Sequence, residues 1–134
     1  MDITHFNDLL SAAHQQPEPQ RLLFVFVRAS LPADATPEQR QRFAAGEGGA
    51  LEPVMCADKS PDELNRFEDL VAEAAQFDQP WQLVFVSSLA GQGGVAPSSA
   101  DAETPLQSIV DSIKSGAPAY CIPFNAAGEP VALA

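Results

Sequence analysis

The residues best suited to chemistry form a short glycine-rich loop, which follows an apolar, strand-like run. The loop is Gly91-Gln92-Gly93-Gly94, and serines stand on both sides of it. Glycines allow a backbone to expose its N–H groups to an anion, and open α/β sheets bind ligands beyond the carboxyl ends of their strands. If the protein binds a nucleotide or a phosphorylated metabolite, we predict that Gly91, Gly93, Gly94 and Ser98 bind it. The loop lacks the Gly-Lys-Ser or Gly-Lys-Thr of a phosphate loop and the helix that follows a dinucleotide fingerprint.

The second candidate is an acidic segment between positions 61 and 78. Its acidic residues are Asp62, Glu63, Glu68, Asp69, Glu73 and Asp78. Such a cluster is typical of a solvated helix face, and it is also suited to docking a basic protein. An exposed Trp81 or Tyr120 would supply an aromatic anchor. We therefore predict a partner-binding face that includes Glu68, Asp69, Glu73 and Trp81.

The histidines and cysteines form no catalytic or metal-binding pattern. His5 and His14 have no third ligand at a metal spacing, so we predict surface or capping histidines and no metal. Cys56 and Cys121 each lie in an apolar segment, which predicts buried free thiols. The alternative is an activated Cys56, because a cation such as Lys59 lowers the pKa of a nearby thiol. Hydrolase, zinc and redox motifs are absent from the sequence, and we predict no cofactor.

The strands that position these residues are predicted from apolar runs. Residues 22–27 and 83–86 are continuous, β-branched and aromatic runs, which are typical of central strands covered on both faces. Residues 51–57 are a weaker strand, and Pro53 favours an edge position for it. Residues 120–124 and 131–133 alternate on either side of the turn 125–128, which predicts a C-terminal β-hairpin at the margin of the sheet.

Four helices are predicted around these strands. Apolar residues at helical spacing place one over residues 3–13, capped by Asp2 or Thr4. Capping boxes at Thr36-Pro37 and Ser60-Pro61 open two more, the first stopped by Gly46 to Gly49 and the second running to about Phe77. The fourth opens at Thr104-Pro105 and closes with Lys114 before Gly116. The predicted fold is a single α/β (or α+β) domain over residues 1–134. It has a mixed sheet of about five strands with helices packed on it, in the order αβαβαβαββ.

Composition restricts the partners. The chain has 134 residues, 46% of them hydrophobic, and its 18 acidic and 7 basic residues give a net charge of −11. That charge argues against binding nucleic acid or an anionic membrane, both of which need clustered Lys and Arg. The sequence shows neither a secretory signal nor an apolar run long enough for a membrane span, so we expect a cytoplasmic protein.

Several segments resemble a known group of proteins. They are Arg-Leu-Leu-Phe-Val-Phe at 21–26, Gly-Glu-Gly-Gly-Ala-Leu at 46–51, Pro-Val-Met-Cys at 53–56 and Gly-Glu-Pro-Val-Ala-Leu-Ala at 128–134. Together they are similar to small uncharacterised proteobacterial proteins that often carry the label ribonucleotide reductase alpha subunit. The resemblance implies a bacterial, cytosolic origin and supplies no site residues. The label implies a radical cysteine, a redox cysteine pair and a tail dithiol, and two isolated cysteines cannot fill those roles.

Two functional hypotheses follow from these features. The first is a non-enzymatic interaction or regulatory module, whose acidic helix face and C-terminal hairpin meet a basic protein. The second is a small-ligand binding protein or enzyme that uses the loop 91–94 and the nearby serines. The sequence indicates no oligomeric state.

Overall fold

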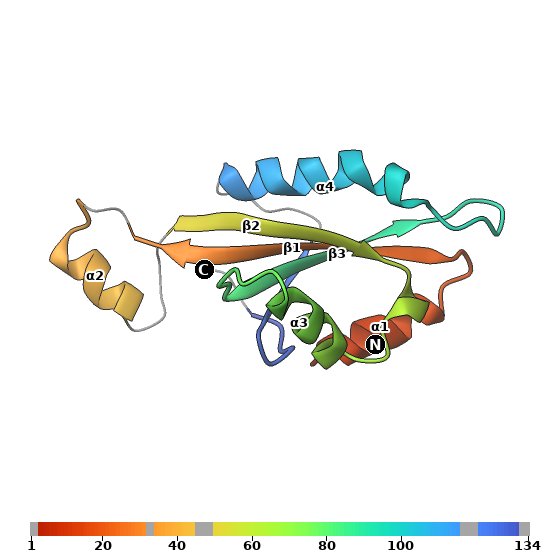
Figure 1. Ribbon diagram of the computed structural model, residues 1–134, viewed down its shortest axis with the longest axis horizontal. Helices are drawn as coiled ribbons and strands as arrows, with labels where there is room; N and C mark the ends of the chain where they lie inside the picture. The colour runs from red at the N-terminus through yellow and green to blue at the C-terminus, as the bar shows by residue number, and fades with distance from the viewer. Residues whose placement is uncertain (1–2, 32–33, 45–49, 116–120, 132–134) are drawn as a thin grey trace.

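A single antiparallel sheet organises the chain (Figure 1), shown here as a computed structural model that describes residues 3–31, 34–44, 50–115 and 121–131. Its strand order is β2-β1-β3-β4. The strands are β1 (Gln20–Ser30), β2 (Ala50–Lys59), β3 (Leu83–Ala90) and β4 (Ile122–Asn125). The helices are α1 (Phe6–His14), α2 (Pro37–Ala44), α3 (Phe67–Ala75) and α4 (Ser99–Lys114), with a 3₁₀ turn η1 (Pro61–Glu63) before α3.

Strand β1 runs through the centre of the sheet and is covered on both faces. Successive side chains of a strand point to opposite faces. Its even-numbered residues from Leu22 to Phe26 pack with α1 and α3, and its odd-numbered residues from Leu23 to Val27 pack with α4. Figure 1 shows the same layers, with α4 above the sheet and α1 and α3 below it. The central strand predicted from the continuous apolar run 22–27 is therefore confirmed, and it pairs with β3.

The predicted mixed sheet of about five strands is wrong in two respects. All three strand pairings within the described residues are antiparallel, and the sheet has four strands. The turn 125–128 of the predicted hairpin is present, because Gly128 has a φ of +81° and its N–H donates to Asn125. Its second arm is reduced to an isolated bridge between Phe124 and Pro130, since proline has no N–H to extend a ladder. The rest of that arm, 132–133, lies outside the described residues.

Strand β2 occupies one edge of the sheet, as Pro53 predicts. A register shift beside Phe26 and Val27 leaves Val54 as an extra residue next to that proline. The irregularity is confined to the first half of the strand. From Met55 to Lys59 the pairing with β1 is regular.

Three helix starts differ from their predictions. His5, and not the predicted Thr4, caps α1, because its Nδ1 accepts the N–H of Asn7; the other predicted cap, Asp2, lies outside the described residues. The Ser60 capping box is present, but it opens only η1, and α3 begins later, at Phe67. Helix α4 begins at Ser99, well before the predicted Thr104, and Pro105 lies inside it.

Helix α2 lies beyond one end of the sheet, on the connection between β1 and β2 (Figure 1). Its predicted capping box is confirmed: Thr36 Oγ accepts the N–H of Gln39, whose side chain accepts the N–H of Thr36. The predicted stop at Gly46 to Gly49 lies outside the described residues, as do Gly116 and Tyr120. None of the helices in the described ranges is both long and apolar enough to cross a membrane.

Candidate functional site

The glycine loop is a tight reversal between two short backbone arms. Gly93 and Gly94 have φ values of +60° and +80°, a conformation that favours glycine at both positions. Gln92 and Val95 exchange N–H to C=O hydrogen bonds on either side of them, at 3.1 and 3.0 Å. Gly91 is buried, and its N–H donates to Pro19 at 2.8 Å. The predicted glycines thus build a turn.

This turn has already bound an anion from its own chain. The N–H of Gly94 donates to the carboxylate of Glu18 at 2.9 Å. Ser98 lies beyond the turn, where it caps α4: its hydroxyl accepts the N–H of Asp101, and the Asp101 carboxylate accepts the N–H of Ser98. Most donors that a phosphate would need are therefore taken. The open hollow beside the turn, of about 520 Å³, is lined by Asp101, whose charge is unfavourable for an anion.

The acidic segment is divided among several structural roles. Asp69 accepts the backbone N–H groups of Asn65 and Arg66 at the start of α3. Glu68 is exposed and lies 3.9 Å from Arg66. Glu73 is half-buried and lies 2.5 Å from the ammonium of Lys59. The three predicted residues thus lie on one helix, but only Glu73 borders an apolar surface hollow.

Trp81 and the C-terminal turn are less available than the sequence suggests. Trp81 is half-buried, with its ring 5.0 Å from that of Phe26 in an edge-to-face contact. The turn 125–128 is bound to the start of α1: His5 Nε2 lies 3.0 Å from the Ala127 carbonyl, and the N–H of Phe6 donates to Gly128 at 2.7 Å. Both features therefore stabilise the fold.

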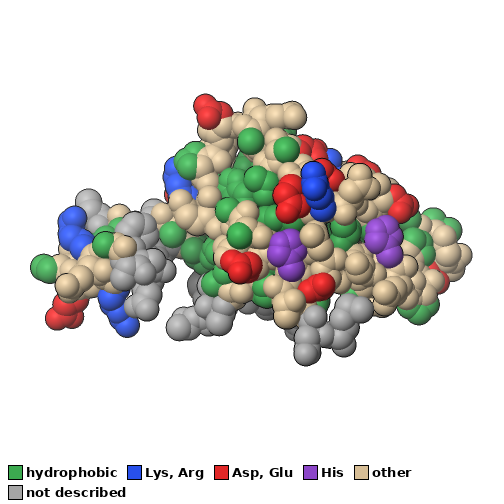
Figure 2. Space-filling view, turned by 90° about the horizontal axis from the view of Figure 1, so that it is seen from below, with side chains coloured by type: hydrophobic (Ala, Val, Ile, Leu, Met, Phe, Trp, Pro, Cys, Tyr) green, Lys and Arg blue, Asp and Glu red, His purple; other side chains and the backbone are tan. Residues whose placement is uncertain are grey.

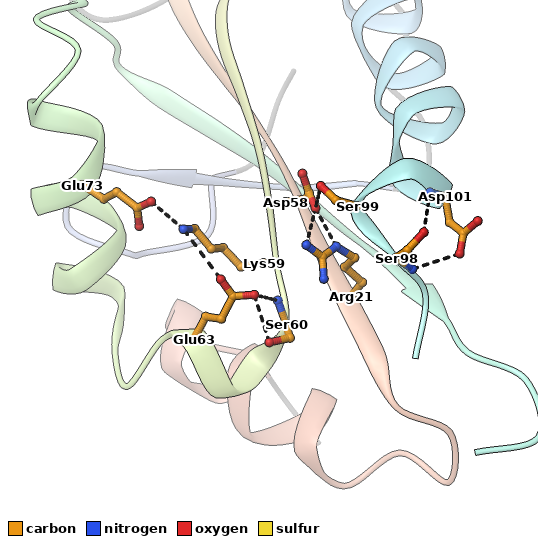
Figure 3. A network of polar contacts seen from close by, with 9 residues as sticks. All are labelled: Arg21, Asp58, Lys59, Ser60, Glu63, Glu73, Ser98, Ser99 and Asp101. Carbon is orange, nitrogen blue, oxygen red and sulfur yellow. Dashed lines mark hydrogen bonds and ion pairs between the residues drawn. The ribbon is translucent and has the colours of Figure 1, made fainter. Parts of the chain in front are cut away.

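The C-terminal end of β2 joins the two helical layers (Figure 3). Asp58 and Lys59 are neighbours in a strand, so their side chains leave opposite faces of the sheet. Asp58 accepts hydrogen bonds from Arg21 on β1, at 2.5 Å, and from Ser99 on α4, at 2.7 Å. Lys59 lies between Glu73 of α3 and Glu63 of η1, at 2.5 and 3.9 Å. These contacts position α3 against the edge strand.

An apolar hollow opens where α3 meets β2, and we call it the α3–β2 groove. Its volume is about 40 Å³, room for the end of one side chain and far below the size of a typical small-molecule site. Phe77, just after α3, is 63% exposed and forms part of its wall. The groove is lined by Phe26, Met55, Cys56, Ala57, Leu70, Glu73, Ala74 and Phe77.

The segment that contains α3 and one wall of the groove is acidic. Residues 61–78 contain six acidic side chains and one basic one, a net charge of −5. One ammonium, that of Lys59, lies between the two carboxylates of Glu63 and Glu73, which leaves a net negative charge there. A backbone N–H donated by Ser60 holds the pKa of Glu63 below its usual range. Figure 2, which looks at the face with α1 and α3, shows hydrophobic side chains exposed among acidic ones.

The predicted burial of both cysteines is wrong for Cys56, which is exposed, whereas Cys121 is half-buried. Both are free thiols, and partial loss of solvent raises the pKa of each thiol. This direction is opposite to that of the activated Cys56 considered from the sequence. No three His, Cys, Asp or Glu side chains gather as metal ligands in the described part of the chain.

Phe77 is the groove residue that sequence reasoning missed. It follows Leu70 and Ala74 at helical spacing, which suggested one more buried position at the end of a core-facing stripe. The helix ends first, at Ala75, and Asp78 adopts a positive φ of 52° just beyond Phe77. The stripe therefore continues past the end of the helix onto the surface. The sequence did not mark the end of the helix at Ala75, so no local signal distinguished Phe77 from a buried position.

Comparison of the chain with protein-family models, with curated proteins and with solved structures found no match.

Proposed function

We propose that this protein is a non-enzymatic interaction module of the bacterial cytoplasm, and that it binds a basic protein partner at the α3–β2 groove. The observation that supports the proposal is Phe77, a large apolar side chain 63% exposed beside an apolar hollow. Aromatic side chains next to small apolar pockets are common anchors of protein interfaces. A groove of about 40 Å³ suits one partner side chain better than a metabolite.

Charge supports a basic partner. Residues 61–78 have a net charge of −5 and the whole chain one of −11. A partner with Lys or Arg around an apolar anchor would be attracted to this face during encounter and oriented on it. This proposal keeps Glu73 from the predicted partner-binding set and adds Phe77. Asp69 and Trp81 contribute to it by holding α3 and the sheet in place.

The test is affinity capture from the source cells with two matched pairs of variants. Phe77→Ser removes the anchor, and Val95→Ser removes another exposed large apolar side chain of the described residues, 71% exposed, on the glycine turn. Glu73→Lys reverses a charge at the groove, and Glu103→Lys makes the same change on α4, on the opposite face. Wild type, Val95→Ser and Glu103→Lys should retain the same partner.

Phe77→Ser and Glu73→Lys should each retain at least about tenfold less of that partner, the loss expected when an interface residue contributes more than about 1.4 kcal/mol. Unfolding curves of all four variants control for loss of fold. Equal capture by Phe77→Ser and Val95→Ser would exclude the groove as the binding surface. The hypothesis of a small-ligand protein stays a prediction, and no feature of the glycine turn favours it.

A further inference from the structure

The outer edge of β2 has backbone groups that point away from the sheet. Pro19 and Val27 direct their carbonyls toward the β3 side of β1, where they accept the N–H groups of Gly91 and Gln82. Because backbone direction alternates along a strand, the odd-numbered residues of β1 face β3 and the even-numbered ones face β2. The even-numbered residues Phe24 and Phe26 stand opposite Ala57 and Met55. Cys56, between those two, must therefore direct its N–H and C=O outward, and Asp58 does the same.

These outward groups are uncovered in the described part of the chain. No hydrogen bond reaches the backbone of Cys56 or Asp58 from outside the sheet. In Figure 1, β2 lies at the front of the sheet with no helix drawn across it. At the opposite edge, the outward carbonyl of Pro123 in β4 accepts the N–H of Val131. The sheet therefore has one covered edge and one open edge.

Natural sheets protect open edges with proline, bulges and charged side chains. In β2 the proline and the irregularity, at Pro53 and Val54, protect the first half of the strand. The charged residues of the second half, Asp58 and Lys59, are turned to the two faces of the sheet and paired there with Arg21 and Glu73. The regular half from Met55 to Lys59 lies directly beside the α3–β2 groove, because Met55 and Ala57 line it. An open edge and an apolar hollow next to it are the two parts of a strand-addition site, in which backbone bonds give affinity and a pocket selects the side chain.

We infer that the partner supplies an extended segment that pairs with residues 55–59 of β2 as a fifth strand. This inference rests on the proposed function and names how that partner binds. Alternate side chains of the segment face α3, so an aliphatic residue would enter the groove and the residues two before and two after it would lie along the same face. Lysine or arginine fits those positions because Glu63 and Glu73 leave this end of the groove negative. A second copy of the chain would bring a net charge of −11 instead.

The test uses a blocked, fluorescent heptapeptide, Thr-Lys-Thr-Val-Thr-Lys-Thr, and the full chain. Fluorescence anisotropy measures the binding of the peptide. Two further peptides have the same sequence with methylated backbone amides: the first is methylated at the threonines, and the second at the valine and the lysines. In an antiparallel pairing with valine in the groove, the threonine amides face β2 and the other amides face solvent. Methylated threonines should weaken binding at least about tenfold, since two or more net hydrogen bonds are lost. Methylated valine and lysines should leave the affinity within about twofold, because their amides make no bond to β2.

Each other outcome overturns part of the proposal in a recognisable way. If both methylated peptides bind like the parent and binding still needs Phe77, the groove is an interaction site and strand addition is wrong. If the parent peptide does not bind at millimolar concentration but capture of a partner still requires Phe77 and Glu73, the inference of an extended basic segment is wrong and the proposed function stands. A sedimenting dimer that does not bind the parent peptide and that Cys56→Pro dissociates would assign the open edge to a second copy, because proline removes an outward N–H of that edge. Loss of both peptide binding and groove-dependent capture overturns the two proposals together.

Discussion

Replacing Gly91 by alanine should destabilise the protein far more than replacing Gly93, although both glycines stand in one turn. A Cβ on Gly91 would lie 2.2 Å from the carbonyl oxygen of Val95 and 3.0 Å from that of Pro19. Both obstacles are backbone, so no side-chain rotation can relieve the contact. Gly93 presents the opposite case: a Cβ there would meet nothing within 4 Å, and its only penalty is a φ of +60°.

The two costs can be compared in magnitude. Gly91→Ala must displace the turn, and overpacking of this kind costs about 1–3 kcal/mol. Breaking one or two hydrogen bonds, such as that from Gly91 to Pro19, adds about 1 kcal/mol for each. We therefore expect a loss of about 3 kcal/mol. For Gly93→Ala, left-handed strain of about 1–2 kcal/mol is partly offset by about 0.4–1 kcal/mol from a less flexible unfolded chain. The expected net loss is about 1 kcal/mol.

The assay is urea unfolding followed by the fluorescence of Trp81, the only tryptophan, whose ring contacts Phe26 in the core. With a slope of about 1.5 kcal/mol per molar urea, Gly91→Ala should lower the unfolding midpoint by about 2 M and Gly93→Ala by less than about 1 M. If Gly91→Ala unfolds at the same urea concentration as Gly93→Ala, the turn is not held against Pro19 and this reasoning fails.

Three further predictions follow. Asn7→Ala should destabilise the protein by about 1 kcal/mol in thermal unfolding, because the Asn7 side chain accepts the first N–H of α3 at 2.9 Å; an unchanged melting temperature would contradict this cap. Hydrogen bonds from capping N–H groups lower the pKa values of the Asp8, Glu63 and Asp101 carboxyls. These carboxylates therefore stabilise the folded protein above the unfolded pKa near 4, and that stability is lost as the pH falls through their folded pKa values. In calorimetry between pH 6 and about pH 3, the melting temperature of the Asp8→Asn, Glu63→Gln, Asp101→Asn triple variant should therefore fall less than that of the wild type. Parallel plots of melting temperature against pH for the two proteins would refute this prediction. Partial burial raises the pKa of the Cys56 thiol, so its alkylation by iodoacetamide at neutral pH should be slower than that of glutathione. The rate for Cys56 should also begin to rise at a higher pH than the rate for glutathione. Alkylation of Cys56 faster than that of glutathione at pH 7 would contradict the environment described.

The strands were predictable where burial on both faces of the sheet produces a continuous apolar run in the sequence. Leu22 to Val27 has no polar interruption because odd and even residues both face helices, and the same holds for Val84 to Val86 of β3. The ends of β1 were missed because polar residues such as Arg21 and Arg28 pair at the margins, where their charges are balanced by Asp58 and Glu52. Hydrophobicity alone cannot detect these pairings.

A capping pattern alone did not fix where a helix starts, since the box at Ser60 opens only η1. At Thr36 the pattern was unambiguous and confirmed. For α4, Thr104-Pro105 imitates a helix start, while the functioning cap is Ser98 with Asp101. Proline in the second turn removes only one backbone bond, and the apolar face of α4, with Ile109 and Ile113 in the core, outweighs that cost.

The candidate site was predictable only in part, because it depends on long-range pairing. The acidic character of residues 61–78 was visible in the sequence, and it led to Glu73. The groove itself requires Met55 and Ala57 of β2 to lie beside α3, which follows from the register with β1 and from the contacts of Lys59. Pro53 indicated an edge strand, but no local pattern encodes the arrangement of that strand with α3, so neither Phe77 nor the groove could be singled out beforehand.

The bonds from His5 to Ala127 and from Phe6 to Gly128 affect how the protein is made. They join residues 122 positions apart in sequence, and the ring of Phe6 lies 5.6 Å from that of Phe124. During synthesis, which adds about 5–20 residues per second, α1 leaves the ribosome well before residues 124–128, against which its first turn packs in the folded protein. For several seconds α1 can therefore pack only on β1 and α3, and the contacts of Phe6 with Phe124 and Gly128 form last.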